Sequence, residues 1–178
     1  MKLAAASIAF AFAFAMACAV PAGAEPPSPT ARAEVAKLAP LVGRWKGVSW
    51  MDLPGGRHHA VSEETVEMRL DGRALLIEGL HRDRETGAVT HHALGVLAWD
   101  DRRREFRMAS ALASGLTGSY GAKLEGKHLV WMLAGPQGPK RRFTIALDVP
   151  GRWLERGEIS DDGVTWKTYF EMRLERVE

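Results

Sequence analysis

Nine turn signals divide the chain after residue 43 into ten short segments, and this spacing constrains the fold more than any other feature of the sequence. The signals combine Gly with Pro, Asp or Thr, as in Asp71-Gly72, Pro150-Gly151 and Asp162-Gly163. Between them apolar and polar residues alternate with the period of two that is typical of half-buried β-strands. The predicted strands are residues 44–51, 60–70, 74–81, 91–99, 105–112, 118–124, 128–134, 141–147, 153–160 and 165–175.

Short strands joined in sequence by tight turns pair with their chain neighbours in antiparallel fashion. A long run of such hairpins favours an up-and-down barrel, because closure removes the two exposed edges. We therefore predict an all-β fold, an antiparallel up-and-down β-barrel of about ten strands, with an open or half-flattened barrel as the alternative. Ser28 or Thr30 can cap a short N-terminal helix that runs to about Leu41, and we place this helix across one end of the barrel.

The first 24 residues predict a secretory signal peptide. Lys2 precedes an apolar stretch rich in Ala and Phe, and Ala22-Gly23-Ala24 forms an A-x-A cleavage site. We therefore expect the protein to be periplasmic or secreted, with no integral membrane segment in the mature chain. The alternatives are a membrane anchor helix, or a lipoprotein attached through Cys18.

Composition limits the chemistry of the remaining chain. Residues 25–37 read as a linker and the start of the helix, and residues 38–178 as the barrel domain. Cys18 is the only Cys in the sequence, so the mature chain contains no disulfide, catalytic thiol or Cys-bound zinc. The formal net charge of +2 and the interspersed charges give no support to nucleic-acid binding. The runs 102–104 and 140–142 are basic, but they fall at predicted turns and strand ends.

Two turns predict which residues face the inside of the barrel. A two-residue loop at Asp71-Gly72 places Ser62 opposite His81. A second such loop at Thr86-Gly87 places His81 opposite His92. Alternation along the strands then gives an inner face that includes Ser62, Glu64, Val66, Ile77, His81, His92, Leu94, Val96, Phe106, Met108 and Phe170. The connections 52–59, 82–90, 113–117 and 135–140 are longer than those near Trp45, so we expect a ligand to enter at the end that they form.

Several motifs, taken in order, resemble a bacterial family of secreted lipocalin-like (calycin-type) barrels that is catalogued as a domain of unknown function. They are Leu-Val-Gly-Arg-Trp-Lys-Gly at 41–47, Asp-Gly-Arg-Ala-Leu-Leu-Ile-Glu at 71–78, Leu-Ala-Trp-Asp at 97–100, Trp153-x-Glu155 and the segment 160–166. The resemblance covers about residues 38–177 and implies a container closed at one end by the indole of Trp45. It also implies that Arg173 or Arg176, near the end of the last strand, stacks on that indole.

The pattern Gly43-x-Trp45-x-Gly47 also resembles the opening of nitrobindin-type barrels, which bind haem. In those barrels a His on a strand close to the C-terminus holds the iron. Here the last His is His128, and the two final predicted strands contain none. We therefore predict no cofactor.

We expect Ser62, Glu64, His81 and His92 to form the polar part of a binding cavity, with the apolar inner residues as its wall. The predicted function is an exported barrel that binds a small, mainly apolar or amphipathic molecule with a polar head. Two imidazoles and a carboxylate could instead hold a divalent metal, or simply line a solvated rim. A hydrolase or isomerase that uses Glu64, His81 and His92 is one alternative function. An envelope interaction protein whose barrel is filled by its own side chains is another.

Overall fold

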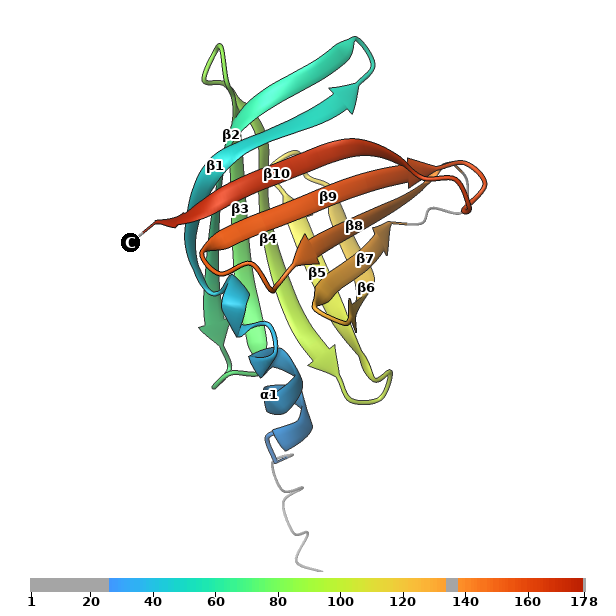
Figure 1. Ribbon diagram of the computed structural model, residues 1–178. Coiled ribbons are helices and arrows are strands. Elements are labelled where there is room, and N and C mark those ends of the chain that lie inside the picture. The colour runs from blue at the N-terminus through green and yellow to red at the C-terminus, as the bar shows by residue number, and fades with distance from the viewer. Residues whose placement is uncertain (1–25, 134–137, 178) are drawn as a thin grey trace, which may run out of the picture.

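The computed structural model describes residues 26–133 and 138–177, and they form a closed antiparallel β-barrel preceded by a short helix (Figure 1). The predicted signal peptide and Cys18 lie outside the described residues. The ten strands confirm the predicted number and order, and each pairs with the strand before it. They are β1 (Gly43–Leu53), β2 (Gly56–Arg69), β3 (Ala74–Asp83), β4 (Val89–Asp100), β5 (Glu105–Leu112), β6 (Thr117–Glu125), β7 (His128–Leu133), β8 (Lys140–Ala146), β9 (Arg152–Ser160) and β10 (Lys167–Val177).

Closure occurs between the first strand and the last. Strand β1 pairs with β2 on one side and with β10 on the other, from Arg44 opposite Val177 to Met51 opposite Phe170. Neither edge of the sheet is left unpaired, which removes the template that an open sheet offers to other chains. None of the helices in the described part of the chain has the length and apolar character needed to cross a bilayer.

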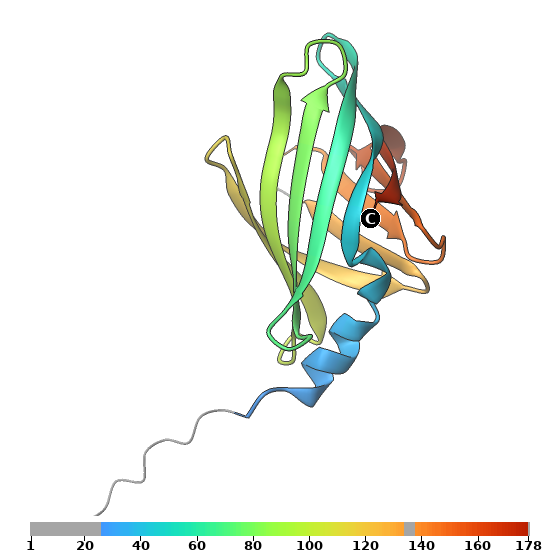
Figure 2. The same ribbon diagram turned by 90° about the vertical axis from the view of Figure 1, so that its left-hand side faces the viewer.

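The helix α1 (Pro29–Ala36) begins where the sequence predicts. The Ser28 hydroxyl accepts a hydrogen bond of 2.9 Å from the Ala31 N–H, and Pro29 occupies the first turn, where no N–H is needed. The helix stops at Ala36, short of the predicted Leu41, and the chain continues into a 3-10 turn, η1 (Ala39–Leu41). Both views show α1 at the end of the barrel where β2 and β4 finish (Figures 1 and 2).

Trp45 closes the same end of the barrel. Its indole N–H donates to the Leu41 carbonyl at 2.8 Å, and its ring meets the edge of Trp153 with ring centres 5.8 Å apart. The Arg176 guanidinium lies 4.1 Å from the centre of the Trp45 ring and donates to the carbonyls of Pro40 and Val42. The stack expected from the lipocalin resemblance is confirmed, with Arg176 as the partner.

Replacing Arg176 with Ala should lower the free energy of unfolding by about 2 kcal/mol, since it removes a cation–π contact and two hydrogen bonds to carbonyls. Urea unfolding measures this loss. Arg173→Ala is the matched control: that side chain is exposed, and its ion pair in the described residues is with Glu171. Equal effects of the two substitutions would show that the stack contributes nothing specific.

The segment 52–59, predicted as one of the longer connections, is instead the tip of a long hairpin. Strands β1 and β2 continue to a tight turn at Pro54-Gly55, and Leu53 pairs with Gly56. Arg57 holds the hairpin together across its strands: it pairs with Asp52 at 2.8 Å and lies 3.5 Å above the Trp50 ring. The hairpin extends beyond the barrel wall (Figure 1).

The register between β2 and β3 confirms the prediction, with Ser62 opposite His81 and Val66 opposite Ile77. The register between β3 and β4 does not. The loop is 84–87, where the Asp83 carboxylate accepts the backbone N–H groups of two later residues, and Asp83 pairs with Ala88. Arg82 then pairs with Val89 but His81 with His91, so Thr90 is the extra residue of a β-bulge.

This shift of one residue turns three predicted inner residues outward. Leu94 and Val96 are 46% and 44% exposed, and the His92 imidazole lies 2.9 Å from the Glu78 carboxylate on the outer surface. The prediction that these residues face inward was wrong, because a one-residue slip exchanges the two faces of a strand. Their places on the inner face, opposite His81, Gly79 and Ile77, are taken by His91, Ala93 and Gly95.

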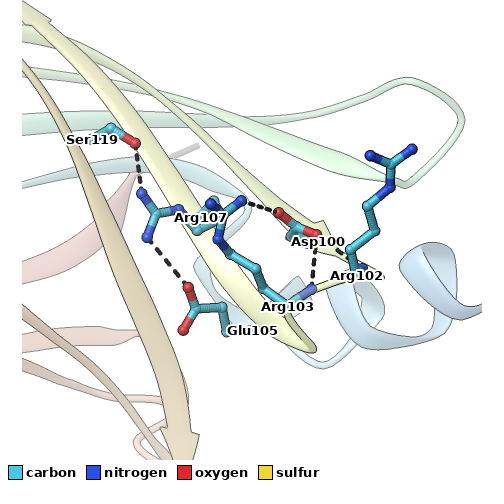
Figure 3. A network of polar contacts seen from close by, with 6 residues as sticks. All are labelled: Asp100, Arg102, Arg103, Glu105, Arg107 and Ser119. Carbon is cyan, nitrogen blue, oxygen red and sulfur yellow. Dashed lines mark hydrogen bonds and ion pairs between the residues drawn. The ribbon is translucent and has the colours of Figure 1, made fainter.

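The basic run at 102–104 is a turn, as predicted (Figure 3). The Asp100 carboxylate accepts the N–H groups of Arg102 and Arg103, and the Arg103 guanidinium pairs with the same carboxylate at 3.1 Å. On the neighbouring strand Arg107 donates to Glu105 and Ser119. The guanidinium groups of Arg103 and Arg107 therefore have partners within the protein.

Candidate functional site

The inner face of the barrel has a packed half and a half that solvent reaches. Near Trp45 the inward side chains are almost completely buried, including those of Val66, Leu75, Leu97, Phe106, Leu129, Ile145 and Leu174. On five strands an inward residue farther toward the opposite end is partly exposed and packs against this core. These residues are Met51, Ile77, Met108, Trp131 and Phe143. The inside of the barrel is therefore accessible in its upper half, at the end away from the helix.

Aromatic rings form much of the wall of this accessible half. Trp131 and Phe143 face each other across β7 and β8 and stack nearly parallel, with centres 5.3 Å apart. Phe143 also contacts Tyr169 and Phe170 edge-on, at 6.0 and 6.1 Å. Tyr169 sits at a bulge in β10, between Thr168 and Phe170. A flat apolar surface of this kind suits an apolar or aromatic ligand.

A chain of buried polar groups crosses the inner face of β1, β2 and β3. The hydroxyls of Ser49 and Ser62 lie 2.8 Å apart, and Ser62 is 3.3 Å from His81 Nδ1. The other ring nitrogen, Nε2, lies 3.3 Å from Glu64 Oε1. Ser49, Ser62 and Glu64 are buried, and the His81 side chain is 13% exposed.

Burial decides where the proton sits in this chain. Loss of solvent raises the pKa of Glu64 to about 8 and lowers the pKa of His81 to about 4. At neutral pH the carboxyl is therefore protonated and the imidazole is neutral. The Glu64 O–H can then donate to His81 Nε2, while the His81 Nδ1–H donates to the Ser62 hydroxyl. Each donor in the chain thus has an acceptor.

Gly79 makes room for the Glu64 carboxyl. It lies opposite Glu64 on β3, and a Cβ added there would approach the carboxyl oxygens to 2.7 and 2.9 Å. The pair of residues explains how a carboxyl fits into a wall otherwise built from apolar side chains. A larger residue at position 79 would push the carboxyl out of its hydrogen bond with His81.

A second inward carboxyl belongs to Glu155 on β9. Its Oε2 accepts the indole N–H of Trp153 at 3.0 Å. Burial raises the pKa of Glu155 to about 8, and the charge of Glu64 adds to that rise. The two carboxyls are thus close enough to interact inside the barrel, although they come from strands at opposite ends of the chain.

The structure brings together most of the residues that the sequence predicts for the site. Ser62, Glu64 and His81 are in contact, and Val66, Ile77, Phe106, Met108 and Phe170 are on the inner face as predicted. His91 replaces His92, and its ring meets His81 edge-on at 5.1 Å. The aromatic residues at 131 and 169 were missed, because no residue of the predicted strand 128–134 was assigned to a face and Tyr169 lies at a bulge that strand alternation does not predict.

A divalent metal site is not evident in the described part of the chain, where no three His, Cys, Asp or Glu side chains gather. The three ligands considered from the sequence were Glu64, His81 and His92. Since His92 points outward, one of the two imidazoles is lost from that set.

A groove of about 590 Å³ lies on the outer face of β7 to β10. The three arginines that line it are paired: Arg142 with Glu158 at 2.8 Å, and Arg156 and Arg173 both with Glu171. These pairs neutralise the positive charge of the groove, so we take the inner site as the candidate.

The fold and the site define a closed ten-stranded β-barrel with a polar cluster on its inner wall. The crystal structure of Rv2717c from M. tuberculosis has a similar fold, with a TM-score of 0.60 over 85% of this chain and 99% of that chain. Sequence identity is 16%, so the similarity establishes the fold alone. No known family profile and no curated protein sequence matches the chain.

Proposed function

We propose that this protein is an exported lipocalin-like barrel that binds a small, mainly apolar molecule with a polar head. The observation that carries the proposal is the pairing of an accessible apolar inner wall with a buried polar cluster. Ligand sites in proteins commonly combine such a wall with a few convergent polar groups. Met108, Trp131 and Phe143 would contact the ligand body, and Ser62, Glu64 and His81 its head.

The partial exposure of the inner wall argues against a barrel filled by its own side chains. In a filled barrel the inward residues at the middle of each strand are fully buried. Ile77 and Met108 hold such positions and are only partly buried. This favours a container over an envelope protein that acts by surface contact alone.

An enzyme remains the second candidate, because Glu64 and His81 form a proton donor and a proton acceptor in direct contact. A carboxyl with a raised pKa beside a neutral imidazole suits proton transfer in a hydrolase or isomerase. The two candidates differ in one respect: Glu64→Gln would abolish turnover of a substrate, whereas a binding site would keep much of its affinity.

Binding can be tested with the neutral fluorescent probe N-phenyl-1-naphthylamine, whose emission rises in apolar surroundings. We expect saturable binding with one probe for each barrel. Ile77→Trp fills the inner space and should weaken binding at least about tenfold, since it displaces the probe from its wall. Val96→Trp is the matched control, because that position is on the outer face of the adjacent strand. Absence of saturable binding, or equal loss in both variants, would contradict the proposal.

Export is supported by the apolar segment before residue 22 and by the A-x-A site at Ala22-Gly23-Ala24. Mass spectrometry of the mature protein from a Gram-negative host would give its first residue. We expect Glu25, whereas a chain that begins at an acylated Cys18 would indicate a lipoprotein.

A further inference from the structure

We propose that the head of the ligand is a protonated amine, held between the carboxyl groups of Glu64 and Glu155. This inference rests on the proposed binding of a small molecule inside the barrel. It adds Glu155 to the site and assigns the ligand a charge.

The two carboxyls approach the inner space from different strands. Glu64 is on β2 and Glu155 on β9, and only β1 and β10 separate these strands in the barrel. Gly79 has no side chain and so leaves space for the Glu64 carboxyl. The Trp153 indole N–H donates to one oxygen of Glu155. Each carboxyl thus keeps one oxygen for which the described residues provide no hydrogen-bond partner. An ammonium group has three N–H donors, enough to serve both carboxyls and a neighbouring hydroxyl.

In the described part of the chain, no Lys or Arg side chain neutralises the pair. Among the described residues neither carboxyl forms an ion pair with Lys or Arg, and the only ionisable partner is His81, at 3.3 Å from Glu64. Burying a carboxylate without a counter-ion is costly, so the empty protein keeps these groups protonated. A bound cation would supply the missing counter-ion, and both carboxyls could then ionise.

An anionic head is disfavoured by the same surroundings. Sites for carboxylates and phosphates use Arg, Lys or clusters of N–H donors. Here the inner wall offers two carboxyls, two hydroxyls and a neutral imidazole. A carboxylate head would bring a negative charge into a region where the described residues offer no Lys or Arg to pair with it.

Other titratable groups near Glu64 and Glu155 do not supply the missing positive charge. The imidazole of His91 lies against His81, and burial together with the charge of His81 lowers the pKa of His91. Burial raises the pKa of the Tyr169 hydroxyl to about 12, so that group stays neutral. Arg141 lies near Tyr169 at the accessible end of the barrel; its side chain is exposed and is not paired with either carboxyl.

Three ten-carbon probes separate the possibilities by isothermal titration calorimetry: decylamine, decanol and decanoate. At pH 7 we expect decylamine to bind at least about tenfold more tightly than decanoate. Binding of the amine should release protons from the two carboxyls, so its affinity should rise between pH 6 and pH 9. The release is measured by repeating the titration in buffers of different ionisation enthalpy. Decanoate, which needs the carboxyls protonated, should show the opposite trend.

The double variant Glu64→Gln, Glu155→Gln should lose the preference for decylamine and keep its affinity for decanol. Decanol binding also shows that the variant is folded, and the pH trend of the unmodified protein is a test that needs no variant. Decanoate binding as tightly as decylamine, or amine binding without proton release, would overturn the inference while leaving the binding function in place. If none of the three probes binds, the proposed function fails as well.

Discussion

The free energy of unfolding should fall by several kilocalories per mole as the pH rises from about 5 to about 9. Folding raises the pKa of Glu64 from 4.5 to about 8, so between these values the folded state holds a proton that the unfolded chain has lost. This contribution to stability is complete below pH 4.5 and is lost as the pH rises through 8. One pKa unit corresponds to about 1.4 kcal/mol, so the loss for this buried group is on the order of 4 kcal/mol.

Two further groups affect how the free energy of unfolding depends on pH. Glu155, whose pKa is also raised to about 8, acts in the same direction as Glu64. His81 acts in the opposite direction: its pKa is lowered from 6.5 to about 4, so it adds stability as the pH rises through that window. The free energy of unfolding should therefore fall slowly with pH below pH 6.5 and most steeply between pH 6.5 and pH 8.

Urea unfolding at intervals from pH 5 to pH 9 measures this decline. Glu64→Gln should make the decline shallower and leave the contribution of Glu155, because the amide keeps a donor for His81 and carries no charge at any pH. Glu63→Gln is the matched control, since that neighbour points outward and pairs with Lys46 at 2.7 Å. A flat curve for the unmodified protein would show that the two inner carboxyls are already ionised.

Gly47→Ala should destabilise the barrel by about 3 kcal/mol or more, because small-to-large changes are most costly where only backbone atoms can yield. A Cβ at position 47 would lie 2.2 Å from the Arg173 carbonyl oxygen and 2.9 Å from the Leu174 Cα. Both atoms belong to β10, which bends closely over β1 at this point. The substitution thus acts on the seam where the barrel closes.

Gly95→Ala is the control for this prediction. Gly95 is also a buried glycine on the inner face, but a Cβ there would meet its neighbours at 3.6 Å or more, which is ordinary contact. Thermal unfolding of the two variants gives the comparison. Similar melting temperatures would mean that β10 moves away from β1 at little cost.

The sequence predicts the strands and their order well, because each hairpin carries its own turn signal. It also predicts the β2–β3 register, since the four-residue turn around Asp71-Gly72 is centred where a two-residue turn would be. The β3–β4 register fails because two irregularities combine: the longer loop held by the Asp83 carboxylate and the bulge at Thr90. The motif Asp83-x-x-Thr86-Gly87 indicates the longer loop, but nothing local indicates the bulge.

The site is predictable only where it depends on a single register. Ser62, Glu64 and His81 come together because one hairpin places them. Glu64 and Glu155 come near each other only because the whole barrel closes. Strand alternation predicts which way a side chain points, but not which distant strands closure brings together. Gly47 is a further case: nothing in the sequence indicates that the backbone of β10 occupies the space where its Cβ would lie.

The seam between β1 and β10 also sets the timing of folding. Arg176 contacts the Val42 carbonyl across 134 positions of sequence, and most of the pairing of β1 with β10 spans a similar distance. Contacts of such long range form late, after the local hairpins. A nascent chain therefore carries β1 with one open edge until the ribosome has delivered the last strand. A chain that ended before β10 would keep that edge for good, and would be prone to pair with a second copy of itself.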